Sequence, residues 1–316
     1  MKITLQDAAK RLKAAKSVVI TAHENPDGDA VGSSLGLMHL LRSVGKTAEV
    51  VLADDVPKIF AMLPGTDEIK KPREDAAKLT PDLFVVLDTS PDDRLGGVDK
   101  TVDAPVLNID HHKTNDGGIG EAYVEPKRAA TAEIIFELSE LMQLKPDEKA
   151  AICLYTGMAT DSGFFRYANT TPYTMRAAGE LIACGAKPHI ISEAIEQKPY
   201  DDVVSMAKAM QTMELSHGGR VIGLYLDYEL TRSLSNTEGL IDQIRVVEGT
   251  EVAVLLKCKE ENLCRVSMRS RGFDVAKIAV AFGGGGHTRA AGCTVREPFA
   301  KAKETILRAL GDALSQ

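Results

Sequence analysis

The sequence contains no tryptophan, and aromatic residues make up only 5% of its 316 residues. An extended surface for stacking nucleic-acid bases is therefore not expected, because such surfaces are built from aromatic side chains. No stretch reaches the roughly 18 uncharged apolar residues of a membrane-spanning helix, which excludes an integral membrane protein. The first residues, MKITLQDAAKRLK, carry charges throughout and lack the apolar core of a secretory signal.

Cysteine is also scarce, and no two cysteines form a C-x-x-C pair. The five cysteines are Cys153, Cys184, Cys258, Cys264 and Cys293. An odd count in a chain of this size argues against a disulfide framework and favours a reducing, cytoplasmic location.

The chain has fewer basic than acidic residues: 38 lysines and arginines and 45 aspartates and glutamates, which give a formal charge of −7. This balance disfavours binding to long duplex nucleic acid through bulk electrostatics, although it allows a local cationic pocket. With 44% apolar and 26% charged residues, the composition is typical of a globular protein. The length is sufficient for two domains.

The first half of the sequence alternates strand and helix patterns. Short, nearly all-apolar runs predict strands at residues 17–22, 46–53, 82–88 and 105–110. Helical patterns surround them, at about 4–16, 29–44, 72–79, 130–144, 147–160, 172–184 and 188–197. Apolar strands separated by helices predict an α/β fold, with a mainly parallel sheet and helices on both of its faces.

The second half begins a new pattern after Pro188 and Pro199. It predicts a helix at 201–214, a strand at 220–227, a hairpin of strands 251–259 and 263–269, a helix at 275–282, a glycine run and a C-terminal helix. This order predicts a smaller mixed α/β domain. We therefore expect a first domain over residues 1–186, a connector over 187–200 and a second domain over 201–316.

Acidic and imidazole side chains end several of the predicted strands. The run HENPDGD follows the first strand and supplies His23, Asp27 and Asp29. In an open parallel sheet, ligands bind at the carboxyl ends of the strands. The proline and the glycine inside this run are typical of a turn, which can direct the three side chains towards one point.

Two more strands end in the same way. Asp88 closes DLFVVLD, and Asp110, His111 and His112 close PVLNID. Asp161 lies in the apolar-rich stretch YTGMATDSGFF. A charged aspartate is rarely buried unless it is paired or bound to a metal, so these positions are candidate ligands.

Together the segments offer four carboxylates and two imidazoles, from His23, Asp27, Asp29, Asp88, His111 and Asp161. Carboxylate and imidazole without thiolate suit Mn²⁺ better than a structural zinc ion. Six ligands exceed the need of one open catalytic ion, so we expect two divalent ions that share a bridging carboxylate. Two ions about 3.5–4 Å apart can activate water and hold both oxygens of a displacement at phosphorus.

Each segment taken alone also has a structural interpretation. Asp88 is compatible with a helix cap, Asp161 with a paired helix residue, and an Asp-His-His triplet with chance. The combination of all four segments, at the ends of predicted elements, favours the metal centre.

The same segments resemble the motifs of the DHH phosphoesterase family, which includes manganese-type inorganic pyrophosphatases, exopolyphosphatases and RecJ-like nucleases. The matching segments lie between residues 22 and 165 and read AHENPDGDAVGSSLG, VVLDTS, NIDHHKTN and TGMATDSGFF. The resemblance implies one Mn²⁺ on His23, Asp27 and Asp88, and a second on Asp29, Asp88, His111 and Asp161. It also implies catalytic roles around the bridging Asp88, with His112 beside the scissile phosphate and Asp110 orienting the histidines.

The second half carries SMRS and FGGGGHTRAAG, which resemble the DHH-associated domain of the same family. Successive glycines let backbone N–H groups approach an anion, and an arginine can hold a phosphate with two parallel hydrogen bonds. The resemblance implies a phosphate-binding set of Arg269, Gly284, Gly285, Gly286 and His287. The structural alternatives are a flexible glycine linker and a solvated surface arginine.

This pair of domains resembles the family members that degrade very short RNA to mononucleotides and convert 3′-phosphoadenosine 5′-phosphate (PAP) to AMP. We therefore expect an Mn²⁺-dependent phosphodiesterase and phosphatase whose substrates are short single-stranded RNA and small nucleotides. The resemblance also implies a homodimer. Two alternatives stay open: a phosphodiesterase for linear dinucleotides such as pApA, and a metal-dependent nucleotide-binding module without turnover.

Overall fold

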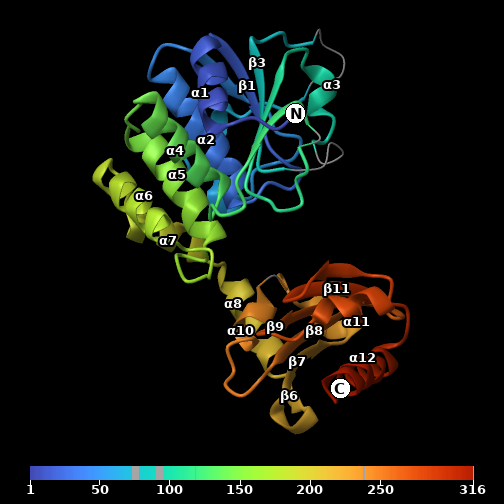
Figure 1. Ribbon diagram of the computed structural model, residues 1–316. Coiled ribbons are helices and arrows are strands. Elements are labelled where there is room, and N and C mark those ends of the chain that lie inside the picture. The colour runs from blue at the N-terminus through green and yellow to red at the C-terminus, as the bar shows by residue number, and fades with distance from the viewer. Residues whose placement is uncertain (73–77, 90–94, 118, 238, 316) are drawn as a thin grey trace. The chain divides into compact units, whose positions relative to one another are not determined.

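The chain folds into two compact units, Met1–Gln197 and Lys198–Gln316, each with its own sheet and core (Figure 1). This computed structural model describes residues 1–72, 78–89, 95–117, 119–237 and 239–315. Among these residues, no helix has the length and apolar character that crossing a bilayer would require.

The first unit is built on a five-stranded, fully parallel sheet in the order β2-β1-β3-β4-β5. Its strands are β1 Ser17–Thr21, β2 Thr47–Val50, β3 Leu83–Leu87, β4 Val106–Asp110 and β5 Glu121–Val124. The four predicted strands and the parallel arrangement are confirmed. The fifth strand was not predicted, because its sequence EAYV is half-exposed and lacks an apolar run.

Helices cover both faces of this sheet unequally. They are α1 Leu5–Ala14, α2 Gly28–Arg42, α3 Val98–Thr101, α4 Thr131–Met142, α5 Glu148–Asp161, α6 Pro172–Ala183 and α7 Pro188–Glu196, with 3-10 turns at Lys58–Phe60 and Thr66–Glu68. The larger core contains Val18 and Ile20 of β1, and the smaller core, on the other face, contains Val19 with Val98 of α3. The helix predicted at 72–79 falls mostly on residues outside the described ranges.

Two glycines bring α2 and α5 into close contact. A Cβ atom on Gly32 of α2 would lie 2.5 Å from the Cys153 carbonyl oxygen of α5, and one on Gly157 of α5 would lie 3.0 Å from Oδ1 of Asp29 on α2. Larger residues at these positions would force the helices apart. The close packing matters for function, because α2 has Asp29 in its first turn and α5 ends at Asp161.

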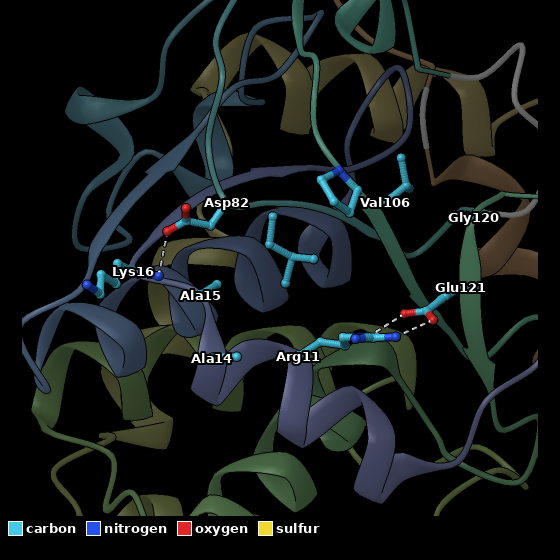
Figure 2. A pocket seen from close by; sticks show the side chains of 10 residues that line it. Arg11, Ala14, Ala15, Lys16, Asp82, Val106, Gly120 and Glu121 are labelled. Carbon is cyan, nitrogen blue, oxygen red and sulfur yellow. Dashed lines mark hydrogen bonds and ion pairs between the residues drawn. The ribbon is translucent and has the colours of Figure 1, made fainter.

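The amino-terminal edge of the sheet is closed by charged side chains (Figure 2). The Asp82 carboxylate accepts hydrogen bonds from the backbone N–H groups of Lys16 and Ser17 at 2.8 and 2.9 Å. Arg11 of α1 binds both carboxylate oxygens of Glu121 at 2.7 Å. A cavity of about 750 Å³ opens beside these groups, and the Asp82, Arg11 and Glu121 charges that line it are satisfied by partners within the protein.

The second unit contains a six-stranded mixed sheet in the order β10-β11-β9-β8-β7-β6, in which only the β7–β8 pair is parallel. Its strands are β6 Met213–Ser216, β7 Val221–Leu226, β8 Val252–Glu260, β9 Leu263–Ser270, β10 Gly285–His287 and β11 Ala290–Val295. Its helices are α8 Tyr200–Met210, α9 Tyr228–Ser233, α10 Leu240–Ile244, α11 Val275–Ala281 and α12 Phe299–Leu314, with a 3-10 turn at His217–Gly219. The predicted mixed α/β domain is confirmed.

Three features of the chain differ from the sequence predictions. The helix predicted to reach residue 214 ends at Met210, and the next residues form the exposed edge strand β6. The predicted connector at 187–200 is mostly α7, whose buried Ile191 belongs to the first core. Cys258 and Cys264, which are cross-strand neighbours on β8 and β9, form a disulfide that the scarcity of cysteine did not lead us to expect.

Candidate active site

The six candidate metal ligands lie together at the carboxyl edge of the first sheet. His23 and Asp27 follow β1, Asp29 lies in the first turn of α2, Asp88 follows β3, His111 follows β4, and Asp161 ends α5. They include two groups whose ligand atoms lie within 4.8 Å of one another: His23 with Asp27 and Asp88, and Asp29 with His111 and Asp161. A third such group consists of Asp88, His111 and His112.

The first group surrounds the His23 ring. Its Nε2 atom lies 3.8 Å from Oδ1 of Asp27 and 3.6 Å from Oδ2 of Asp88. Its Nδ1 atom lies 2.7 Å from the Glu24 carbonyl oxygen. Because a carbonyl oxygen only accepts, Nδ1 carries the proton in the neutral ring and Nε2 turns its lone pair towards the carboxylates.

The second group surrounds the His111 ring. Its Nε2 atom lies 3.3 Å from Oδ2 of Asp161, 3.9 Å from Oδ2 of Asp29 and 3.5 Å from Oδ1 of Asp88. Its Nδ1 atom lies 3.3 Å from the Arg128 carbonyl oxygen, which fixes the ring in the same way. Asp88 therefore presents Oδ2 to the first group and Oδ1 to the second, as a bridging carboxylate would.

Asp88 has an unusual backbone conformation. Its φ angle is +55°, in the left-handed region that residues other than glycine seldom adopt and that Asn and Asp tolerate best. Such strained residues gather at functional sites. The residue is only 1% exposed, and Oδ1 accepts a hydrogen bond of 3.1 Å from the Thr131 hydroxyl.

The amino-terminal ends of two helices hold the neighbouring carboxylates. Oδ1 of Asp27 caps α2 by accepting the backbone N–H groups of Asp29 and Ala30, each at 3.0 Å. Asp29 in turn accepts the N–H groups of Thr131 and Ala132, which begin α4, at 2.6 and 2.8 Å. Helix N-termini favour negative charge, so both carboxylates are oriented by the backbone before any ligand binds.

Asp110 organises the two consecutive histidines. Its Oδ1 atom accepts the backbone N–H groups of His111 and His112 at 2.8 and 3.1 Å and lies 2.7 Å from Nδ1 of His112. Its Oδ2 atom accepts a hydrogen bond of 2.8 Å from the Asn115 amide. Asp110 is fully buried, whereas the His112 side chain is 43% exposed and keeps Nε2 for an external partner.

The acidic groups at this edge perturb one another. Burial, together with the charges of Asp88 and Asp161, raises the pKa of Asp29, and burial raises the pKa of Asp161 to about 6. Burial alone would lower the pKa of His23, but contacts with Asp27 and Asp88 outweigh it and raise the pKa to about 10. Within the described ranges no lysine or arginine pairs with Asp29 or Asp88. A donor set of crowded oxygens and imidazoles without a protein counter-charge fits divalent cations.

Two supporting residues were missed at the sequence level. Asn115 lies inside the predicted NIDHHKTN segment but carries no charge, and Thr131 lies in a stretch with no motif at all. Thr131 contacts Asp29 across 102 positions of sequence, so only the fold reveals it.

In the second unit, Arg269 lines a pocket of about 280 Å³ on β9 with two further arginines, Arg245 and Arg271. Glu251 also lines the pocket, but its carboxylate is bound by Arg220 at 2.6 Å. Arg245 directly follows α10, far from Arg269 in sequence, and no motif marked it. The pocket has the charge that a phosphate group requires.

The glycine run is partly an edge strand rather than an open loop. Residues Gly285–His287 form β10 and pair with β11. A Cβ atom on Gly284 would lie 2.2 Å from the Gly292 carbonyl oxygen, and Gly286 has a φ of +139° and a similarly close neighbour, so both glycines serve the packing of β10 on β11. Gly285 meets no such obstacle, and the side chain of His287 is outside the described part of the structure.

Two family models match the chain, the DHH family N-terminal domain over residues 17–158 and the DHHA1 domain over residues 218–316. This chain belongs to the DHH family. The four motif segments lie mostly in the first match, and SMRS and FGGGGHTRAAG lie in the second.

Known proteins are similar to this DHH chain over almost its full length. The bifunctional oligoribonuclease and PAP phosphatase NrnA of Thermus thermophilus is 36% identical, with 98% of this chain and 94% of the relative covered. The protein of the same name from Mycoplasma genitalium is 27% identical, with 92% of each chain covered. The crystal structure of an exopolyphosphatase-related protein from Bacteroides fragilis superposes with a TM-score of 0.87 at 23% identity, covering 99% of this chain and 97% of its own, which shows that the fold is shared.

Proposed function

We propose that the chain is a two-metal phosphoesterase that hydrolyses short oligoribonucleotides to mononucleotides and removes the 3′-phosphate of PAP to give AMP. The observation that carries the proposal is the convergence of four carboxylates and two imidazoles around Asp88, with His112 directly beside them. The near full-length similarity to proteins named for these two activities supports the choice of substrates.

The donor set supports two divalent ions, and we propose Mn²⁺. Oxygen and imidazole ligands without thiolate suit this ion. One ion would be held by His23, Asp27 and Asp88, and the other by Asp29, Asp88, His111 and Asp161. Such ions supply Lewis-acid chemistry, namely activation of a water and neutralisation of charge at phosphorus.

The remaining residues position the substrate. His112 offers Nε2 to a phosphate oxygen, because Asp110 occupies Nδ1 and holds the ring. The hydrogen bond from His112 to Asp110 raises the pKa of His112, which favours the protonated ring and therefore donation to an anion. In the second unit, Arg269 lies with Arg245 and Arg271 in a pocket suited to a phosphate group.

One substrate panel tests the proposal. The purified chain with Mn²⁺ is incubated with PAP, pApA, a five-nucleotide RNA, a 24-nucleotide RNA, pyrophosphate and polyphosphate, and products are separated by anion-exchange chromatography. We expect AMP from PAP and complete conversion of the short RNAs. Preference for the 24-mer or for polyphosphate contradicts the assignment, turnover of pApA alone supports the linear-dinucleotide alternative, and binding without any product supports a binding module.

A further inference from the structure

One face of the second sheet is covered over only part of its width. On β8, Ala253 and Leu255 are buried in a small core with residues of β7, α8 and α10. On β9, the residues of the same face are Arg265, Ser267 and Arg269, and none of them is buried. Alternate residues of β9 point the other way, into the core that packs against α11 and α12.

A groove of about 550 Å³ runs over this uncovered part of the sheet. Strand register places Lys257 of β8, Arg265 of β9 and Thr294 of β11 side by side across it. Arg296, two residues beyond Thr294, lines the same groove. Gly292 also lines it, and because glycine has no side chain it does not fill the groove. Three cationic side chains therefore face one hollow, and no acidic residue is part of its described lining.

The two arginines of the groove differ from Arg220 and Arg308 of the same unit. Arg220 is paired with Glu251, and Arg308 is paired with Glu304. Arg265 and Arg296 are exposed, and neither forms an ion pair with any residue in the described part of the chain. In a chain with a formal charge of −7, two such arginines in one hollow indicate an anionic ligand.

The groove and the arginine pocket lie along the same face of β9. Arg265 and Arg269 are four residues apart on one strand face, which corresponds to about 13 Å at the usual strand rise. A stacked nucleic-acid strand advances about 3.4 Å per nucleotide, so this distance spans about four nucleotides. Ser267 and Gly292 lie between the two arginines and leave room for a sugar–phosphate chain.

We propose that the groove lined by Lys257, Arg265 and Arg296 is a subsite for the phosphates of a single-stranded oligonucleotide, beyond the phosphate held at Arg269. The proposal rests on the proposed function and adds to it a reason for substrate length. With one phosphate at Arg269, PAP or a dinucleotide is too short to span the distance of about 13 Å to Arg265, whereas an RNA of about five nucleotides is long enough. The contacts are electrostatic, so the subsite is indifferent to base sequence.

The test is the double variant Arg265→Gln, Arg296→Gln, assayed on a pentanucleotide, a dinucleotide and PAP. We expect kcat/KM for the pentanucleotide to fall about five- to ten-fold relative to that for PAP, as the removal of two solvent-screened cations would produce. The salt dependence of the pentanucleotide KM should also become shallower, by about 0.7 in the log–log slope for each phosphate that the protein no longer neutralises. Arg308→Gln, which removes an exposed arginine from α12, is the matched control.

The outcomes separate this inference from the proposed function. The proposed subsite is contradicted if kcat/KM falls equally for all three substrates. It is also contradicted if both the ratio of kcat/KM for the pentanucleotide to that for PAP and the salt slope stay unchanged. Binding of a labelled pentanucleotide to the Asp88→Asn protein, measured by fluorescence anisotropy with and without the double variant, checks the groove independently of turnover. If the unmodified enzyme hydrolyses none of the substrates but the double variant still weakens pentanucleotide binding, the proposed function fails and the anion subsite stands.

Discussion

Thr131 joins the two halves of the candidate metal centre, and its hydroxyl can be removed without changing the size of the side chain. Its backbone N–H binds Asp29 at 2.6 Å, and its hydroxyl donates to Oδ1 of Asp88 at 3.1 Å. The substitution Thr131→Val keeps the backbone contact and deletes only the hydroxyl. The residue is fully buried, so no water takes its place freely.

The expected loss can be estimated in two ways. A hydrogen bond to a charged group contributes about 1.5–3 kcal/mol. Residues that orient metal ligands change metal affinity by about 10–100-fold when they are mutated. Because about 1.4 kcal/mol corresponds to a tenfold change in a binding constant, the two estimates agree. We therefore expect Thr131→Val to weaken Mn²⁺ binding by about 10–100-fold.

The assay titrates metal-free protein with Mn²⁺ and follows the free ion by electron paramagnetic resonance, which does not depend on catalysis. Thr131→Ser, which keeps the hydroxyl, should bind as the unsubstituted protein does. Thr156→Val is the matched control, because it removes a buried hydroxyl that donates to the Ile152 carbonyl oxygen at 2.8 Å and touches no ligand. If Thr131→Val binds Mn²⁺ within about two-fold of Thr131→Ser while both remain folded by circular dichroism, the reasoning is refuted.

Three other measurements test the site and its surroundings. Asp88→Asn should abolish turnover of every substrate, because asparagine does not supply a charged bridge between two ions. The thermal unfolding profile should be retained, because asparagine tolerates the positive φ of +55°. Residual activity above about 1% would contradict the bridging role. Arg269→Ala should raise KM for PAP at least about ten-fold yet leave hydrolysis of a small artificial phosphodiester nearly constant, and equal losses on both would remove Arg269 from the phosphate site. Burial raises the pKa of the Cys293 thiol to about 11. At pH 8, iodoacetamide should therefore alkylate Cys293 far more slowly than the less buried Cys184, and mass spectrometry of the native protein can measure both rates. Similar rates would contradict the burial of Cys293.

Much of the first unit could be predicted because its signals are local. Short apolar or β-branched stretches mark β1, β3 and β4, and acidic or imidazole residues of the site lie at or just beyond the end of each strand. Parallel strands bring their carboxyl ends to one edge, so a one-dimensional pattern becomes a three-dimensional cluster without further information. The strand β5 lacked such a run, and it was missed for that reason.

The remainder depends on contacts between distant segments. Thr131, at the start of α4, reaches Asp29 only through the placement of α4 beside α2, and Arg245 reaches the pocket of Arg269 only through the placement of α10. No spacing rule connects such positions. The same holds for the groove, whose cations come from three segments of the second sheet and look like ordinary surface residues in the sequence.

The charge of the metal centre explains why its ligands are held so firmly by the backbone. When both histidines are neutral and all four carboxylates are ionised, as ligands of metal ions must be, the site carries −4, and burial and mutual repulsion oppose this state by raising the pKa values of Asp29 and Asp161. Side chains under such repulsion would separate unless something fixed them, and the N-termini of α2 and α4 fix Asp27 and Asp29 through four backbone hydrogen bonds. Dipoles of this kind orient the carboxylates without neutralising them, as lysines or arginines would. The arrangement therefore keeps the negative charge available for divalent cations, and in the proposed function the charge of the phosphate is met by the arginines of the second unit.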